Sequence, residues 1–357
     1  MKNPYFPISV PREPKITISE KDIAFGYIFN YTLQKFNRSV FMKNEITIKK
    51  FNFKHDYERC IQFLTDCYQE NKNMSCWLPQ RFDDFVFRIG NMERHKKSIE
   101  FIYLFEEEDK IVGLIAPDGE AFNSCIKNGY EHIFSEMVDF AEKNLIPLLK
   151  ENEDGTYDFY VVSHDSMTYQ AKLLEKRGYT KEKEEDYDNV QHPLKNEYKI
   201  TLPKGFHQAY GENLDETMKA EACHYGFHPE HDDGILTHRI GDIIPSFQGR
   251  KKSKYFKDCF ESLIVTDDGD ICCYCFCYVD KKTRTGFIEP VSTREKYRKK
   301  GFCRQMLNGV MIRLKKMGIE NCYINSYDWR RNVYTHCGFK TEDSIGYWHK
   351  KISADIK

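Results

Sequence analysis

One stretch near the C-terminal end constrains the fold more than any other part of the chain. It runs from Phe287 to Leu307 and combines a predicted strand, a basic glycine loop and a predicted helix that begins at Gly301. The start of a helix offers unpaired backbone N–H groups and the positive end of the helix dipole, so it favours an anion. Four cations surround this point: Arg298, Lys299, Lys300 and Arg304. The stretch therefore predicts an α/β fold with a phosphate-binding site.

The spacing of the loop differs from the two commonest phosphate loops. The chain contains neither Gly-x-x-x-x-Gly-Lys-Ser/Thr nor Gly-x-Gly-x-x-Gly, so a nucleotide triphosphatase or a Rossmann enzyme is not expected. The run from Arg298 to Cys303 instead resembles the cofactor motif of the GNAT superfamily of acyl-CoA-dependent N-acyltransferases, Arg/Gln-x-x-Gly-x-Gly/Ala. The alternative is a solvated helix start, which is disfavoured because cations oppose the dipole there.

The resemblance implies a fold and a set of cofactor contacts. The expected fold is α/β in the α+β sense, a mixed, mostly antiparallel twisted sheet flanked by helices. Coenzyme A carries a pyrophosphate and a 3′-phosphate. The pyrophosphate would be held by the backbone N–H groups of the loop from Lys299 to Arg304, which includes Gly301, Phe302 and Cys303. The basic side chains would help to bind the 3′-phosphate. Pro290 cannot donate to a sheet ladder, so the strand should part from a neighbour there. By resemblance, the backbone of Val291, Ser292 and Thr293 would then contact the pantetheine arm, with the Val291 N–H near the thioester carbonyl.

Two residues are candidates for proton transfer. Tyr334 lies four residues before Gly338, where the family places a tyrosine that protonates the leaving thiolate, and a phenol with a pKa near 10 can do so. The alternative is an aromatic side chain that only packs. Glu289 shares a strand face with Val291 and could take the proton of the amine, or it could be a surface or substrate-positioning carboxylate.

Two departures from the family pattern stand out. Cys303 replaces a glycine or alanine, and it is either a tolerated small side chain or, with a pKa lowered by the helix N-terminus, a redox switch. The asparagine that often opens the last helix of the family is replaced by Tyr327-Asp328. This replacement puts one contact to the pantetheine arm in doubt.

Two halves of similar pattern indicate a tandem duplication. Each half ends in a short predicted helix stopped by a glycine and followed by an aromatic residue, and Gly178 and Gly338 are 160 residues apart (338 − 178). We place a first domain at 42–200 and a second, catalytic domain at 201–357, with a broken strand over Glu197–Phe206 near the boundary. Residues 1–41 are interpreted as a loose, disordered extension or as an upstream start.

The first half lacks the glycine loop. Around Asn123 to Glu136 there is no Arg-x-x-Gly-x-Gly, although Asn128-Gly129 lies nearby. We expect a degenerate GNAT-like domain that no longer binds acyl-CoA and instead shapes the substrate cleft or stiffens the enzyme. The second half holds the best-defined helix, Gly301–Met317, whose apolar stripe should face the sheet.

Composition limits the partners and the compartment. With 54 basic and 55 acidic residues the formal net charge is −1, so no global field attracts nucleic acid or a membrane. No apolar run of about 18 residues and no signal peptide is present, so cytoplasm is the expected location. The 13 cysteines are odd in number and are interpreted as reduced thiols. Four of them lie in a predicted strand as small hydrophobes rather than metal ligands, and no metal is expected: Cys272, Cys273, Cys275 and Cys277.

The expected activity is transfer of an acetyl group from acetyl-CoA to a primary amine of a small molecule or peptide. Two alternatives remain: a protein that binds acyl-CoA or a small amine without turnover, and an aminoacyl transferase of the FemX kind, which the cofactor loop argues against. The acidic run Glu230-His-Asp-Asp233 could face a cationic amine or form a solvated loop. Acyl preference, acceptor identity and oligomeric state stay open.

Overall fold

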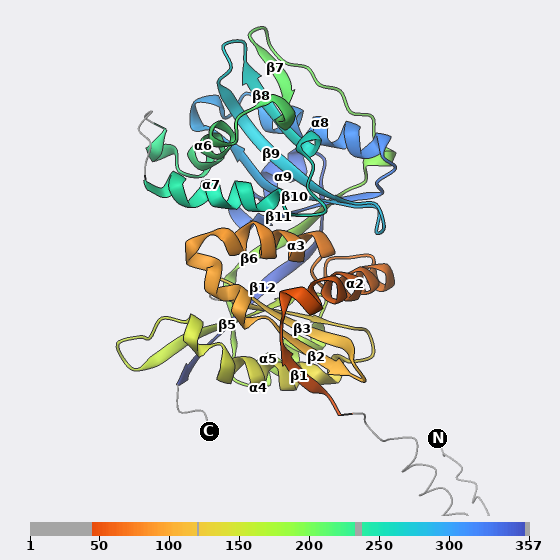
Figure 1. Ribbon diagram of the computed structural model, residues 1–357, viewed down its shortest axis with the longest axis vertical. Helices are drawn as coiled ribbons and strands as arrows, with labels where there is room; N and C mark the ends of the chain where they lie inside the picture. Colours follow the sequence, from red (N-terminus) through yellow and green to blue (C-terminus); the bar gives the residue numbers. More distant parts are fainter. Residues whose placement is uncertain (1–44, 120, 233–237, 354–357) are drawn as a thin grey trace, which may run out of the picture. The chain divides into compact units, whose positions relative to one another are not determined.

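The computed structural model describes residues 45–119, 121–232 and 238–353, so the predicted extension at 1–41 lies outside the described residues. The strands of this part form one 12-stranded sheet with the order β1-β2-β3-β4-β5-β12-β6-β11-β10-β9-β8-β7, and helices flank it (Figure 1). Most neighbouring pairs are antiparallel, and β4–β5 and β10–β11 are parallel. The predicted mixed, mostly antiparallel sheet flanked by helices is confirmed.

The two halves have the same order of elements: strand, two helices, three strands, helix, strand, helix, strand. The first half consists of β1 Thr47–Lys50, α2 Phe53–Asn71, α3 Pro79–Phe87, β2 Tyr103–Glu107, β3 Lys110–Asp118, β4 Ala121–Ile126, α4 Phe134–Asn144, β5 Thr156–His164, α5 Thr168–Lys176 and β6 Thr180–Gln191. The second consists of β7 Phe206–Tyr210, α6 Glu216–Phe227, α7 His238–Arg250, β8 Glu261–Thr266, β9 Ile271–Asp280, β10 Thr285–Thr293, α8 Phe302–Lys316, β11 Asn321–Tyr327, α9 Asp328–His336 and β12 Lys340–Ser353. This repeated order is what a tandem duplication produces.

The last strand of each half pairs with the other half. β12 lies between β5 and β6, with Ile345 opposite both His164 and Asp186. β6 in turn pairs with β11, where Tyr323 lies opposite Val190. In Figure 1 the blue β12 accordingly runs among the strands of the first half. This exchange makes the sheet continuous across the halves, and the sequence analysis did not foresee it.

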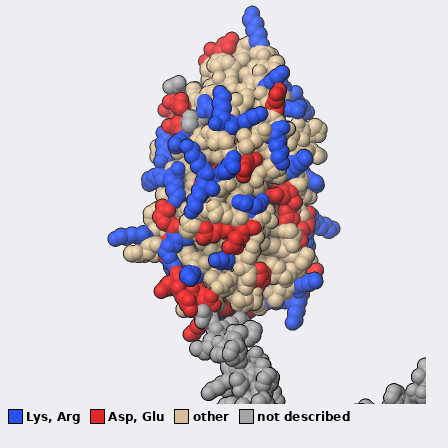
Figure 2. All heavy atoms as spheres, turned by 90° about the vertical axis from the view of Figure 1, so that its right-hand side faces the viewer, with Lys and Arg blue, Asp and Glu red and all other residues tan. Residues whose placement is uncertain are grey.

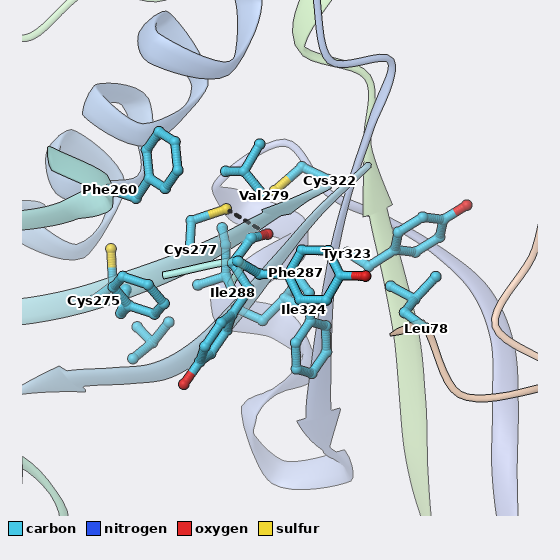
Figure 3. Close-up of a cluster of buried hydrophobic side chains, with 14 of the residues drawn as sticks. Leu78, Phe260, Cys275, Cys277, Val279, Phe287, Ile288, Cys322, Tyr323 and Ile324 are labelled. Carbon is cyan, nitrogen blue, oxygen red and sulfur yellow. Dashed lines mark hydrogen bonds between the residues drawn. The ribbon is translucent and has the colours of Figure 1, made fainter. Parts of the chain in front are cut away.

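The larger hydrophobic core also spans both halves. Leu78, at the start of α3, belongs to the same buried cluster as Phe287 of β10 and Tyr323 of β11 (Figure 3). Gln80 of α3 donates from Nε2 to the Thr285 hydroxyl at 2.7 Å inside this core. The α8 stripe is buried as predicted, and β9 is buried on both faces, including its four cysteines.

One predicted strand is absent. Residues 196–205 form no helix or strand, and β7 begins only at Phe206. The backbone of this segment bonds to side chains of α8 instead: the Thr201 N–H donates to Gln305 Oε1 at 2.8 Å, and Asn308 Nδ2 donates to the Lys199 carbonyl at 2.8 Å. These bonds give the Thr201 N–H and the Lys199 carbonyl partners outside a strand ladder.

Charged side chains of both signs cover the surface seen in Figure 2. Lys and Arg gather in the upper part of this face, and Asp and Glu are more frequent below. Among the helices of the described residues, none is long and apolar enough to cross a membrane.

Candidate active site

The strands β10 and β11 part in the middle of the second half. Their parallel pairing covers only Thr285–Phe287 against Asn321–Tyr323. Beyond Phe287 the edge of β10 that faces β11 has no strand partner, and the register of β10 against β9 shifts between Ile288 and Val291. The prediction that the strand parts from a neighbour near Pro290 is therefore confirmed, and two cavities lie beside this part of β10.

The first cavity, called the loop cavity below, has a volume of about 820 Å³. Its walls come from the end of β10, the basic loop and the helices α8 and α9. It brings together all predicted cofactor residues except Lys300: Val291, Ser292, Thr293, Arg298, Lys299, Gly301, Phe302, Cys303 and Arg304. The Lys300 ammonium lies 5.4 Å from the ring centre of Tyr297, which is itself a wall residue.

The loop holds its backbone open at the start of α8. Lys299 and Gly301 have positive φ angles of 60° and 78°, and a Cβ at Gly301 would meet nothing within 4 Å. In the described part of the chain, the N–H groups of Phe302, Cys303 and Arg304 have no hydrogen-bond acceptor. Because the helix dipole adds positive potential, this geometry suits a phosphate group.

Arg298 holds the loop in place rather than projecting freely. Its Nε donates to the Thr293 carbonyl at 3.1 Å, and its Nη2 donates to the Gly226 carbonyl at 2.8 Å. Gly226 lies so close to β10 that a Cβ there would be 2.5 Å from the Ser292 Cβ. The Ser292 hydroxyl is buried in the wall of the loop cavity and has no hydrogen-bond partner. A polar group of a ligand would satisfy it.

The second cavity, called the junction cavity below, has a volume of about 380 Å³ and is lined by residues of both halves. Three residues line both cavities: Val291, Arg330 and Tyr334. Tyr334 is 6% exposed, and burial raises the pKa of its hydroxyl well above the usual value. No described residue hydrogen-bonds to this hydroxyl, so it is available to a molecule in either cavity.

Glu289 lies in the wall of the junction cavity, between two guanidinium groups of the first half. Its Oε1 accepts from Arg88 Nη2 at 2.8 Å, and its Oε2 lies 3.4 Å from Arg81 Nη1. Arg81 lies in α3 and Arg88 caps the end of that helix. These pairs could not be predicted from local sequence patterns, because they join positions about 200 residues apart.

Further carboxylates of the junction cavity come from the exchanged strands. On β6, Asp188 accepts from Asn325 Nδ2 at 2.5 Å and lies 2.8 Å from His164 Nε2. Asp186 accepts from the Tyr347 hydroxyl at 2.5 Å, and burial, followed by the nearby Asp188, raises the pKa of its carboxyl. Burial alone would lower the pKa of His164, but its contact with Asp188 outweighs this effect and raises it. The sequence analysis missed these residues because only strand exchange brings them to the site.

The acidic run at 230–233 lies elsewhere. Asp232 forms a two-point ion pair with Arg294, at 2.5 and 2.9 Å, while Glu230 is mostly exposed and contacts His228. Neither carboxylate lines the loop or the junction cavity, and Asp233 lies outside the described residues. Ligand atoms of His228, Glu230 and His231 lie within 4.8 Å of one another, which is compatible with a metal ion.

The two thiols of the loop cavity affect one another. Cys303 lies beside Cys337, and this contact together with burial raises the pKa of the Cys303 thiol well above the usual value. The direction of this shift is opposite to the lowered pKa considered for Cys303 at the helix N-terminus. A raised pKa leaves less reactive thiolate, which favours the interpretation of Cys303 as a tolerated small side chain.

Comparison with known proteins agrees with this geometry. Residues 237–339 match the model of the acetyltransferase (GNAT) family. A GCN5-related N-acetyltransferase from Sphaerobacter thermophilus is similar in fold, with a TM-score of 0.57 at 15% identity over 86% of this chain and 96% of the other. A tandem GNAT protein from the clavulanic acid biosynthesis pathway has a TM-score of 0.56 at 11% identity, over 86% and 98%.

An acetyltransferase of the GNAT family from Colwellia psychrerythraea also shares the fold, with a TM-score of 0.52 at 10% identity over 85% of this chain and 99% of the other. A comparison with curated protein sequences gave no match. The family match includes every wall residue of the loop cavity except Gly226, and the structural matches span both halves. A segment of the second half, residues 237–339, thus matches the GNAT acetyltransferase family, and the fold of both halves together is similar to that of GNAT acetyltransferases, including a tandem GNAT protein.

Proposed function

We propose that the protein transfers an acetyl group from acetyl-CoA directly to a primary amine, and that the reaction takes place in its second half, residues 201–357. The first half, residues 42–200, binds no cofactor in this proposal and supplies part of the acceptor site. The observation that carries the proposal is the wall of Val291, Arg330 and Tyr334 that the two cavities share. It allows a thioester in the loop cavity to meet an amine in the junction cavity.

The residues of the loop cavity fit the chemistry of coenzyme A. The free N–H groups at the start of α8 would hold the pyrophosphate, and the exposed Lys299 and Arg304 would add charge around it. The pantetheine arm would lie along the unpaired edge of β10, where the buried Ser292 hydroxyl lacks a partner. Arg298 acts here as a positioning residue, because its guanidinium is engaged by two backbone carbonyls.

The transfer itself needs two proton movements. The neutral amine attacks the carbonyl carbon of the thioester, the new C–N bond forms, and the C–S bond breaks. The nitrogen, positively charged once the C–N bond has formed, would lose one proton to solvent water. Tyr334 would donate its proton to the departing sulfur, so that the thiol leaves, and would recover a proton from solvent. The Val291 N–H would stabilise the negative charge that develops on the carbonyl oxygen.

Glu289 has two proposed roles, and its ion pairs favour the positioning one. Both of its oxygens face guanidinium groups of α3, so few lone pairs remain for a proton from the substrate. In this role Glu289 ties the first half to the reacting edge of β10 and orients the acceptor. Glu289→Gln distinguishes the roles: loss of a base changes the pH profile of kcat, whereas loss of positioning raises KM.

The activity is tested by acetyl transfer from acetyl-CoA to a panel of primary amines, with Tyr334→Phe as the variant. We expect kcat to fall by about 100-fold while the affinity for acetyl-CoA changes little, because only transition-state proton transfer is lost. Tyr169→Phe in α5 of the first half is the matched control and should keep full turnover.

Other outcomes identify the alternatives. Binding of acetyl-CoA without turnover on any amine would indicate a sensor. Turnover only with an aminoacyl-tRNA donor would indicate a FemX-like transferase. Full activity of Tyr334→Phe would reject the tyrosine as the acid while leaving the family assignment intact.

A further inference from the structure

Building on the proposed function, we propose that the acceptor is a diamine: a molecule with the amine that is acetylated at one end, a hydrocarbon spacer, and a second cationic group that is bound by Asp186. The second group would lie at the end of the junction cavity formed by β6 and β12.

The cavity is assigned to the acceptor independently of its charge. It shares Val291, Arg330 and Tyr334 with the loop cavity, so a molecule inside it reaches the reacting edge of β10. Its far wall is built by strands that the two halves exchange, including Tyr347 of β12. An acceptor that fills the cavity therefore touches both halves.

The two ends of the cavity differ in how their carboxylates are neutralised. Asp118 and Glu289 both pair with Arg81, and Glu289 also pairs with Arg88. Asp186 forms no ion pair with any described residue, and its recorded partner is the neutral Tyr347 hydroxyl. The neighbouring Asp188 has one imidazole and one amide as partners, from His164 and Asn325. Among these four carboxylates, Asp186 is thus the one whose partner is a neutral hydroxyl, and the remaining arginine of the wall, Arg330, forms no ion pair with it.

A half-buried carboxylate without a cation is unfavourable, because it has lost part of its hydration and gained no opposite charge. The raised pKa of Asp186, which follows from burial and from Asp188, has this physical cause. An ammonium group placed beside Asp186 would remove the penalty and gain a charge-assisted hydrogen bond. A carboxylate-bearing acceptor would instead be repelled there.

Strand spacing sets the length of the molecule. β6 is separated from β10 by β11, so the two strands are about two inter-strand spacings, or roughly 10 Å, apart. Because β10 and β11 part beyond Phe287, this separation is a lower bound near Val291. Ile324 lies on β11, the strand between β6 and β10, and it lines the cavity together with Ile288 of β10; Ile345 of β12 lies opposite Asp186 and lines the β6 end. A flexible alkyl chain between two ammonium groups matches this pattern.

The test compares three acceptors of equal chain length on the native protein: diaminohexane, hexylamine and aminohexanoate. We expect kcat/KM for diaminohexane to exceed that for hexylamine by about tenfold or more, as one charge-assisted hydrogen bond would give, and aminohexanoate to be the poorest. Asp186→Asn keeps a hydrogen-bond acceptor for the Tyr347 hydroxyl but removes the charge. In this variant the ratio of kcat/KM for diaminohexane to kcat/KM for hexylamine should fall close to one. Asp165→Asn is the control, because this exposed carboxylate lies outside the cavity and should leave the ratio unchanged.

The outcomes separate this proposal from the proposed function. Equal turnover of diamine and monoamine, or aminohexanoate as the best acceptor, would overturn the diamine assignment and leave the acetyltransferase intact. If no amine is acetylated, the proposed function fails, and calorimetry with diaminohexane alone then decides. Binding that Asp186→Asn weakens would still support the cation site, and absence of binding would overturn it. The comparison of acceptors on native protein remains decisive even if the variant does not fold.

Discussion

The two halves share one order of elements but differ at the points where chemistry is expected. At the start of α8 the backbone N–H groups are free and the loop is basic. In the corresponding loop of the first half, before α4, the Gly129 N–H donates to the carboxylate of Glu131 at 2.9 Å. A side-chain anion therefore already occupies a donor of the first-half loop, where the second half leaves room for a phosphate.

The difference extends to the proposed acid. Tyr334 lies four residues before Gly338, and the residue four before Gly178 is Leu174, which is fully buried. The first half nevertheless contributes to the site, because Arg81 and Arg88 form ion pairs with Glu289 and residues of β6 line the junction cavity. In the proposed function, the first half holds no cofactor and instead contributes walls to the acceptor site beside the second half. The predictions below probe this division.

The largest effect is expected where the exchanged strand completes the other half. Trp348 of β12 is 5% exposed and packs in the core of the first half. Trp348→Ala should lower the free energy of unfolding by about 3–5 kcal/mol, as is typical for a buried tryptophan. Urea unfolding measures the loss, and hydrogen exchange should locate it in β5 rather than in α8.

Trp329→Ala is the matched control, because Trp329 lies in the preceding helix and is 72% exposed. Its effect on stability should stay within about 0.5 kcal/mol. Equal destabilisation by both substitutions would contradict the claim that β12 stabilises the first half. So would a loss of hydrogen-exchange protection in α8 alone.

The next effect concerns Arg298, the arginine that holds the basic loop before α8. Arg298→Ala removes the hydrogen bonds to Thr293 and Gly226 and should weaken acetyl-CoA binding by about tenfold, measured by calorimetry. Arg177 plays a comparable part in the first half, where it donates to the Ser135 carbonyl at 3.0 Å. Arg177→Ala should leave the affinity unchanged, and a similar loss in both variants would mean that the first half contributes to cofactor binding.

A smaller effect is expected from the exposed lysine of the loop. Lys299→Gln should weaken acetyl-CoA binding by a few-fold, about 0.3–1 kcal/mol, and the difference should shrink at high salt because exposed charges are screened. Lys127→Gln in the first-half loop is the control and should not alter the affinity. Titrations at low and high ionic strength measure both, and a salt-independent loss would indicate a structural role for Lys299.

The smallest effect should come from the His164–Asp188 pair. The folded-state pKa of His164 is raised above its unfolded value, so its stabilising contribution is present below about pH 6.5 and is lost as the pH rises through the folded pKa. The difference in unfolding temperature between the native protein and His164→Asn should therefore be larger at acidic than at alkaline pH. A difference that does not change with pH would mean that the imidazole acts only through packing.

The sequence predicted the fold class and the basic glycine loop that precedes α8, because these depend on local signals. The glycine at 301, the basic run and the α8 stripe each act within one element and its neighbours. The exchange of β6 and β12 could not be predicted, since either strand could have paired within its own half. The residues that depend on this exchange, Asp186 and Asp188, were missed for the same reason, as were the arginine partners of Glu289.

The central claim, that only the second half binds acetyl-CoA, is tested most directly by calorimetric titration of the native protein, Gly301→Glu and Gly129→Glu. The two glycines are matched: both have positive φ, 78° and 87°, and a Cβ at either would meet nothing within 4 Å. We expect the native protein to bind one acetyl-CoA per chain. In Gly301→Glu the affinity for acetyl-CoA should fall by about 100-fold or more, because a carboxylate enters the proposed phosphate site, and in Gly129→Glu the affinity should equal that of the native protein. Two sites per chain, or a loss of binding in Gly129→Glu with Gly301→Glu unaffected, would contradict the claim.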